Sequence, residues 1–295
     1  MEPLDFQKPA LAEITARARA YFAFWNGPYR DMLLQPRWAC ILVAPTAVGK
    51  TTTASMVSEA IGASMLRISA PSYMPTGAHN RGCKETIIII AQHVAKNDRT
   101  LLVVDELDKI NDPDNTWHGY IRNELMDLIG GVFPTGLNMD DCDLTIEALN
   151  EKLRTTVFIL GIGTFQSFFD SKPSRRSIGF GNDDADPSDE ITAEIIAQRL
   201  PRELSNRFGK IVRLPELKET DYYQIAQEAE RKLPEPMRIV FREEVSKRIP
   251  EAIEAKKGVR YIEEAVTATL IHLQTEPTLI ITPVKTIQET PECTL

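Results

Sequence analysis

The chain has 295 residues, of which 43% are hydrophobic and 26% are charged, the composition of a globular protein with a full core. Its net charge of −8 argues against broad nonspecific binding to nucleic acid and leaves room only for a local basic strip. The longest aliphatic run, Ile87–Ile90, is too short to span a membrane.

The first residues and the cysteines indicate the compartment. Residues 1–5 include two acids and no basic segment, so no secretory signal is expected. The four cysteines are scattered with no CxxC pair, which favours reduced thiols over a zinc site or a disulfide framework. We therefore expect a cytoplasmic protein without membrane contact.

Helical and strand patterns alternate along most of the chain. The predicted helices cover residues 9–25, 50–61, 85–95, 120–129 and 191–206, with a short helix at the end of 134–152. The predicted strands cover residues 39–43, 65–69, 101–104, 157–161 and 211–214. Such alternation predicts an α/β fold in which a parallel sheet lies between layers of helices.

Residues 221–272 have a helical pattern almost throughout and predict a second, smaller domain. The expected domains are a large α/β domain at 1–215, a helical lid at 216–285 and a flexible tail at 286–295. A polar segment at 171–190, rich in Ser, Asp and Gly, is expected to form a mobile insertion in the large domain.

The segment Ala44-Pro-Thr-Ala-Val-Gly-Lys-Thr joins the first predicted strand to the helix that follows it. A loop in this place presents unpaired backbone N–H groups and the positive end of the helix dipole to an anion, as a phosphate-binding loop does. Lys50 can reach the outer phosphates of a nucleotide, and the Thr51 hydroxyl can bind Mg²⁺. The residues expected to hold the nucleotide are Pro45, Thr46, Ala47, Val48, Gly49, Lys50, Thr51 and Thr52.

This loop departs from the usual pattern at its first position, where Ala44 stands in place of Gly. If the position needs a left-handed backbone, the alanine costs about 1–2 kcal/mol, and otherwise it costs nothing. A chance Gly-Lys-Thr at the start of a helix is the alternative interpretation of the segment.

A second motif lies at the end of the strand 101–104, where Asp105 and Glu106 follow. Asp105 can hold the Mg²⁺ shell, and Glu106 can polarise an attacking water as a general base. A strand that ends in solvated acids is the alternative. Because Asp105 comes 55 residues after Lys50, a helix, a strand and a second helix fit between the motifs. Together they predict a nucleoside-triphosphatase that uses ATP and Mg²⁺.

The stretch Leu-Pro-Arg-Glu-Leu-Ser-Asn-Arg-Phe at 200–208 resembles an AAA+ ATPase, in which an Arg ends the helix before the last core strand. The resemblance implies that Arg207 is an arginine finger, which contacts the nucleotide of a neighbouring subunit. The alternative is an Arg that stabilises the end of its own helix. Lys257-Gly-Val-Arg260 resembles the second sensor of the lid, which implies a γ-phosphate contact for Arg260, against an ordinary surface pair. Thr164 is the nearest candidate for the first sensor, with a simple loop Thr as the alternative.

Longer motifs resemble the Clp unfoldases ClpX and HslU. Leu101–Ile110 is similar to that group's Asp-Glu-Ile-Asp-Lys-Ile segment, Asn123–Val132 to the helix after it, and Phe158–Phe165 to its strand ending in Gly-Ala-Phe. The stretch Leu200–Arg207 matches its Leu-x-x-Glu-Phe-x-Gly-Arg in register. The resemblance covers residues 4–285 and implies a ring of identical subunits, expected to be a hexamer, that acts on a protein client.

Two loops give conflicting indications of how the chain acts on a partner. Ile178-Gly179-Phe180 is identical to the tripeptide with which ClpX docks on its peptidase, and an apolar pair packed on its own domain is the alternative. The loop 76–82 has His79-Asn80 where these unfoldases carry an aromatic–aliphatic pair that grips polypeptide, and Tyr73 is displaced from that place. A weak grip on a client is therefore expected.

These motifs predict a Clp-like AAA+ ATPase that remodels a protein partner. Two other functions stay open, namely a nucleotide-switched regulator or loader associated with DNA and an assembly scaffold timed by hydrolysis. The His79-Asn80 loop favours the regulator, whereas the acidic net charge and the Ile178-Gly179-Phe180 tripeptide favour a protein partner. Nucleic acid is therefore the less expected partner.

Overall fold

The computed structural model describes residues 2–32, 35–76, 85–112, 114–134, 144–165 and 200–275. Three predicted features lie outside these residues, namely the pair His79-Asn80, the segment 171–190 with its Ile178-Gly179-Phe180 tripeptide, and the tail 286–295. The chain divides into two compact units, Met1–Glu216 and Leu217–Leu295.

Five parallel strands form the sheet of the first unit, in the order β2-β3-β4-β1-β5. The strands are β1 (Cys40–Val43), β2 (Ser64–Ser69), β3 (Thr100–Asp105), β4 (Val157–Gly163) and β5 (Lys210–Arg213). Every pair of neighbours in this order runs parallel. The segments that follow β1, β3 and β4 therefore leave the sheet at one edge, the carboxyl edge, where open α/β sheets bind ligands.

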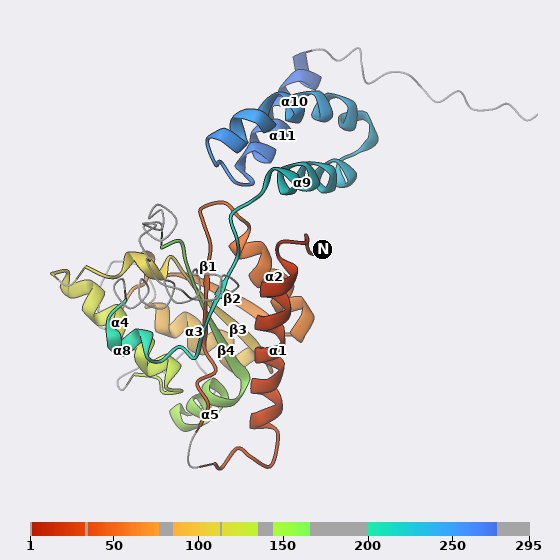
Figure 1. The fold of residues 1–295 in the computed structure, drawn as a ribbon. Helices are drawn as coiled ribbons and strands as arrows, with labels where there is room; N and C mark the ends of the chain where they lie inside the picture. Colours follow the sequence, from red (N-terminus) through yellow and green to blue (C-terminus); the bar gives the residue numbers. More distant parts are fainter. Residues whose placement is uncertain are drawn as a thin grey trace, which may run out of the picture. The chain divides into compact units, whose positions relative to one another are not determined.

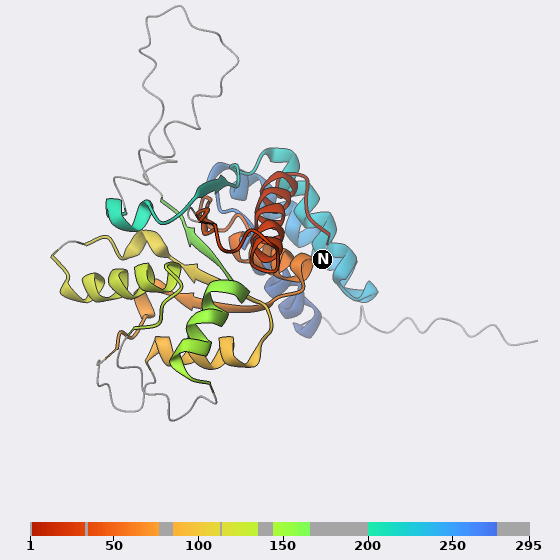
Figure 2. The same ribbon diagram turned by 90° about the horizontal axis from the view of Figure 1, so that it is seen from below.

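Helices cover both faces of this sheet. The helices of the first unit are α1 (Lys8–Trp25), α2 (Lys50–Ile61), α3 (Thr86–Lys96), α4 (Thr116–Ile129), α5 (Ile146–Thr156) and the short α8 (Arg202–Ser205). Figures 1 and 2 show α1 and α2 on one face of the sheet and α3, α4 and α5 on the other. The predicted α/β fold, a parallel sheet between layers of helices, is confirmed.

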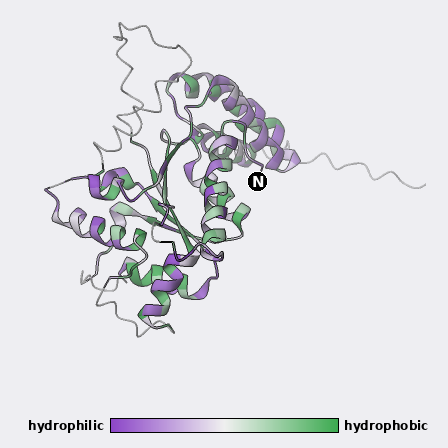
Figure 3. Cartoon of the chain, turned by 60° about the horizontal axis from the view of Figure 1, so that its bottom comes forward, coloured by the Kyte–Doolittle hydropathy of each residue, from purple (hydrophilic) through white to green (hydrophobic). Residues whose placement is uncertain are grey.

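The core under α3 explains why a run of isoleucines forms a helix. Ile87, Ile90 and Val94 are spaced by three and four residues along α3, and all three are fully buried. They pack in one cluster with Leu102 of β3. The strands are coloured mostly as hydrophobic in Figure 3. Full burial of each such side chain stabilises the fold by about 1.5–3 kcal/mol.

One predicted helix is wrong in its described part. The helix expected at 191–206 is interrupted at Pro201, whose backbone is extended with φ −51° and ψ 139°, and α8 begins only after it. Proline lacks the N–H that a helix interior needs, and its ring disfavours the helical conformation of the residue before it. A continuous helix through Leu200 and Pro201 is therefore excluded.

The second unit consists of three described helices, α9 (Glu219–Lys232), α10 (Glu235–Glu254) and α11 (Arg260–Thr275). Its core gathers side chains from all three helices, including Tyr222, Phe241 and Tyr261. Arg260 is the first residue of α11 and is exposed. In the part of the chain that the structure describes, no helix has both the length and the apolar character to cross a lipid bilayer.

Candidate active site

The loop between β1 and α2 has two residues with a left-handed backbone. Gly49, just before α2, has φ 87° and ψ 29°, which glycine adopts without strain. Ala47 is also left-handed, with φ 59°, whereas Ala44 is not. The alanine at the first position of the loop therefore causes no such strain, and the cost of about 1–2 kcal/mol belongs to Ala47 instead.

Lys50 connects this loop to the end of β4. Its Nζ donates hydrogen bonds to the carbonyl oxygens of Ala44 and Pro45 at 2.9 and 2.8 Å, and to Thr164 Oγ1 at 3.4 Å. Because Thr164 directly follows β4, the structure brings the predicted first sensor beside the loop lysine. The carbonyl oxygens hold the ammonium group at the start of α2, where phosphate oxygens can replace them.

The remaining loop residues surround the same turn. Val48 is buried, Thr46 is exposed, and the other predicted contacts are half-buried. Thr51 and Thr52 lie in the first turn of α2, so the Thr51 hydroxyl is available at the helix start. A hydroxyl and a carboxylate are the hard oxygen donors that Mg²⁺ takes in proteins.

Gln7 lies behind the loop as a buried polar residue. It is 3% exposed, and its Nε2 donates to Thr53 Oγ1 of α2 at 3.3 Å. A Cβ added to Gly49 would lie 3.2 Å from this nitrogen, which gives a second reason for glycine there. The contact joins residues 46 positions apart, so no local sequence pattern could have predicted it.

Asp105 ends β3 and is held by an arginine from the neighbouring strand. The Nε and Nη2 atoms of Arg67, on β2, lie 2.9 and 2.6 Å from Asp105 Oδ2. The other oxygen, Oδ1, accepts the backbone N–H of Glu106 at 2.8 Å. The aspartate side chain is only 9% exposed. The Arg67 guanidinium forms an ion pair with the carboxylate that we expect to bind Mg²⁺.

Glu106 is held by two side chains. Its Oε2 accepts a hydrogen bond from Ser69 Oγ of β2 at 3.1 Å, and its Oε1 pairs with Lys109. The Lys109 hydrogen bond is the main cause that holds the pKa of Glu106 below its ordinary value of 4.5. Glu106 is therefore ionised at neutral pH, as a general base must be. Its backbone is left-handed, with φ 57°, a strained conformation for a residue with a side chain.

Asp108 links the acids to the end of β4. Its Oδ1 accepts the backbone N–H of Thr164 at 3.1 Å, and its Oδ2 accepts the N–H of Phe165 at 3.2 Å. Phe165 is 2% exposed and has a left-handed backbone, with φ 47°. One carboxylate therefore fixes the backbone that carries Thr164, and this positioning residue was not predicted from the sequence.

The structure does not bring Arg207 into this group. Arg207 precedes β5, at the amino edge of the sheet, whereas the loop with Lys50 follows β1 at the carboxyl edge. Arg260 belongs to the second unit, and its role as a sensor stays a prediction. Tyr73 is 2% exposed and donates to Glu124 Oε2 at 2.9 Å, so it cannot serve as an exposed aromatic grip.

The segment that carries most of these residues matches a known protein family. Residues 40–170 match the family model described as the ATPase family associated with various cellular activities (AAA). The chain contains an AAA ATPase domain. The matched segment includes the loop 44–51, Asp105, Glu106 and Thr164, and it supports nucleotide binding and ATP hydrolysis in general. No curated protein matches the chain, and the narrower likeness to ClpX and HslU stays a prediction.

The Lys109→Ala substitution in the AAA domain is expected to lower the free energy of unfolding at neutral pH but not at low pH. Lys109 depresses the pKa of Glu106 in the folded protein, so the stability that the pair adds is present above the ordinary pKa of 4.5. This stabilisation is lost as the pH falls through the lowered pKa of Glu106 in the folded protein. Urea unfolding over this pH range tests the sign, with Lys109→Arg as the charge-preserving control. A stability difference that is the same at every pH would contradict the pairing.

Proposed function

We propose that the chain is a Clp-like AAA+ ATPase, active as a homo-oligomeric ring of six subunits, that couples ATP binding and hydrolysis to remodelling of a protein partner. The observation that carries the proposal is a set of contacts at the carboxyl edge of the sheet. Lys50 contacts Thr164, and Thr164 is fixed by Asp108, two residues after Glu106. A phosphate-binding lysine and a polar sensor are thus joined by direct contacts, and the carboxylate that fixes the sensor lies two residues after the proposed general base.

Each residue of this group has a role that follows from its chemistry. Lys50 exchanges the carbonyl oxygens of Ala44 and Pro45 for phosphate oxygens, because an ammonium group binds an anion more strongly than a neutral carbonyl. Glu106 accepts the proton of the attacking water. Thr164 Oγ1, beside Lys50, orients that water against the terminal phosphate.

Thr51 and Asp105 are the proposed ligands of Mg²⁺. The bound ion supplies positive charge to the phosphate oxygens during transfer. The donor set fits this ion, because both side chains offer hard oxygen donors, and the Arg67 contact on Asp105 Oδ2 is the one that the ion would have to displace.

Arg207 is the proposed finger for the nucleotide of a neighbouring subunit. Parallel pairing of β1 with β5 puts the loop and Arg207 at opposite ends of these four-residue strands, about 10 Å or more apart. Arg207 therefore does not reach the loop of its own chain, which supports catalysis between subunits. In the helical lid, Arg260 is the proposed contact with the terminal phosphate.

A protein client is the proposed partner of the ring, and Glu106→Gln provides the test. This form should stay ATP-bound and retain the client, so a pull-down with Mg-ATP should recover one protein in stoichiometric amount. Lys50→Ala is the matched control, because it should not bind ATP and should release that protein. Recovery of DNA in place of protein would favour the nucleotide-switched regulator instead. Docking of a Clp-type peptidase on Ile178-Gly179-Phe180 stays a separate prediction.

Arg67→Ala is expected to lower the Mg²⁺ concentration that half-saturates ATP binding, by roughly threefold to tenfold. Arg67 competes for the Asp105 carboxylate, and its removal frees Oδ2. Titration of a fluorescent ATP analogue at increasing Mg²⁺ measures the effect without turnover. Arg67→Lys keeps the charge but loses the two-nitrogen contact, so its Mg²⁺ requirement should lie between those of the wild type and Arg67→Ala. A higher Mg²⁺ requirement in Arg67→Ala would show that Arg67 orients Asp105 rather than competes for it.

A further inference from the structure

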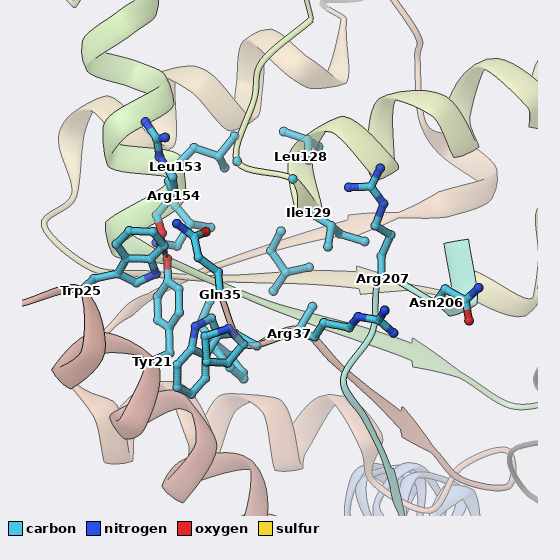
Figure 4. A pocket seen from close by; sticks show the side chains of 18 residues that line it. Tyr21, Trp25, Gln35, Arg37, Leu128, Ile129, Leu153, Arg154, Asn206 and Arg207 are labelled. Carbon is cyan, nitrogen blue, oxygen red and sulfur yellow. Dashed lines mark hydrogen bonds between the residues drawn. The ribbon is translucent and has the colours of Figure 1, made fainter. Parts of the chain in front are cut away.

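A pocket of about 480 Å³ lies at the amino edge of the sheet, away from the loop 44–51 (Figure 4). Its wall contains Ala39 before β1, Val157 at the start of β4 and Arg207 before β5. The size is within the range of pockets that bind small molecules. The nucleotide loop contributes no residue to this wall, so the pocket is a separate hollow of the same unit.

The pocket is positively charged although the chain as a whole is acidic. Arg37, Arg154 and Arg207 line it, and none of its described lining residues is an Asp or a Glu. Arg154 pairs with Glu151 at 2.9 Å, whereas Arg37 and Arg207 form no ion pair with any residue that the structure describes. In Figure 4, Arg37 and Arg207 lie on one side of the pocket, and Trp25 and Arg154 on the other. Two arginines without an ion-pair partner in the described part of the chain thus line one hollow, where they attract an anion.

The aromatic wall of the pocket contains hydrogen-bond donors without acceptors. The indole nitrogens of Trp25 and Trp38 are buried and have no hydrogen-bond partner among the residues that the structure describes. The Tyr21 hydroxyl, in contrast, donates to the Arg154 carbonyl at 2.8 Å and accepts the Val157 N–H at 3.1 Å. A buried donor left unpaired is unfavourable, but these two nitrogens are not exposed to the hollow, so acceptor oxygens of a ligand reach them only if the indole rings move.

We propose that this pocket binds the phosphate groups of a nucleotide, with Arg37 and Arg207 on the phosphate oxygens. A phosphate that carries about two negative charges matches two guanidinium groups, whereas a carboxylate supplies only one. The inference rests on the proposed function, which brings the nucleotide of a neighbouring subunit to Arg207. It adds Arg37 as a second phosphate-binding arginine. The nucleotide comes either from the neighbouring subunit or from solution.

The first arm of the test examines nucleotide from solution. In the Lys50→Ala background, at a concentration where sedimentation shows monomers, ATP is added and tryptophan fluorescence is recorded. Trp25 and Trp38 line the pocket, and Trp117→Phe removes the remaining indole. Binding from solution gives a saturable change that Arg37→Ala weakens by about 10- to 100-fold. Arg30→Ala is the matched control, because Arg30 is an exposed arginine that lies beside Asp31 outside the pocket.

The second arm examines the nucleotide of the neighbouring subunit. In the assembled protein with an intact Lys50, Arg37→Ala should reduce ATP turnover about tenfold or more, and Arg37→Lys should recover part of it. The arm in which the loss appears identifies the source of the nucleotide. If Arg37→Ala equals Arg30→Ala in both arms while Arg207→Ala is slow, this inference is wrong and the proposed function stands. If Arg207→Ala also keeps the wild-type turnover, the proposed role of Arg207 fails as well.

Discussion

Lys50→Ala is expected to weaken ATP binding by about 100-fold or more, because it removes the ammonium group that the phosphate oxygens contact. Glu106→Gln is expected to retain ATP affinity and to lower turnover by roughly 10²–10⁴, because an amide cannot accept the proton of the attacking water. Asp105 is unchanged in the second variant, so the proposed Mg²⁺ ligand stays in place. Titration of a fluorescent ATP analogue and phosphate release, measured on both variants, separate binding from hydrolysis.

Two exposed residues provide matched controls for these changes. Lys96, at the end of α3, and Glu243, on α10, are both exposed. Lys96→Ala and Glu243→Gln should bind and hydrolyse ATP as the wild type does. Wild-type turnover in Glu106→Gln would remove Glu106 from the role of general base. Wild-type affinity in Lys50→Ala would remove the loop from phosphate binding.

Arg207→Ala is expected to leave ATP binding nearly unchanged and to reduce turnover by roughly 10³ or more. The reason is geometric, because Arg207 lies at the opposite end of the sheet from the loop of its own chain. The proposed finger therefore does not act on the nucleotide held by the loop of its own chain. Steady-state phosphate release measures the loss. Arg202→Ala is the matched control, since Arg202 is an exposed arginine on the adjacent short helix α8.

Mixing two inactive variants distinguishes this role from a purely structural one. Arg207→Ala subunits retain the loop, and Lys50→Ala subunits retain the finger, so a mixed ring contains some complete sites. Turnover of the mixture should exceed that of either variant alone. A mixture that stays inactive, with wild-type chains that remain monomeric in ATP, would contradict catalysis between subunits.

The elements of the fold were predictable where the chain marks their ends. The helix expected at 50–61 is observed as Lys50–Ile61, because the left-handed Gly49 and Gly62 bound it on both sides. The isoleucine run at the start of α3 was correctly assigned to a helix, since its apolar residues recur every three or four positions. The helix expected at 191–206 was wrong where Pro201 interrupts it.

The contacts that complete the candidate site depend on strand order, which no local pattern contains. Arg67 and Ser69 were recognisable as two residues on one face of a strand. Only the pairing of β2 with β3 places them against Asp105 and Glu106. Asp108 likewise reaches Thr164 because β3 and β4 are neighbours in the sheet. The acids and the loop were therefore visible in the sequence, while the residues that hold them were not.

The most direct test of the account is the ATP turnover per chain as the protein concentration is raised, with sedimentation velocity measured on the same samples. The account predicts that monomers turn over ATP as slowly as Arg207→Ala, and that turnover per chain rises by roughly 10³ as the ring assembles. Turnover per chain that is constant from monomer to ring, or absent in every state, would contradict it.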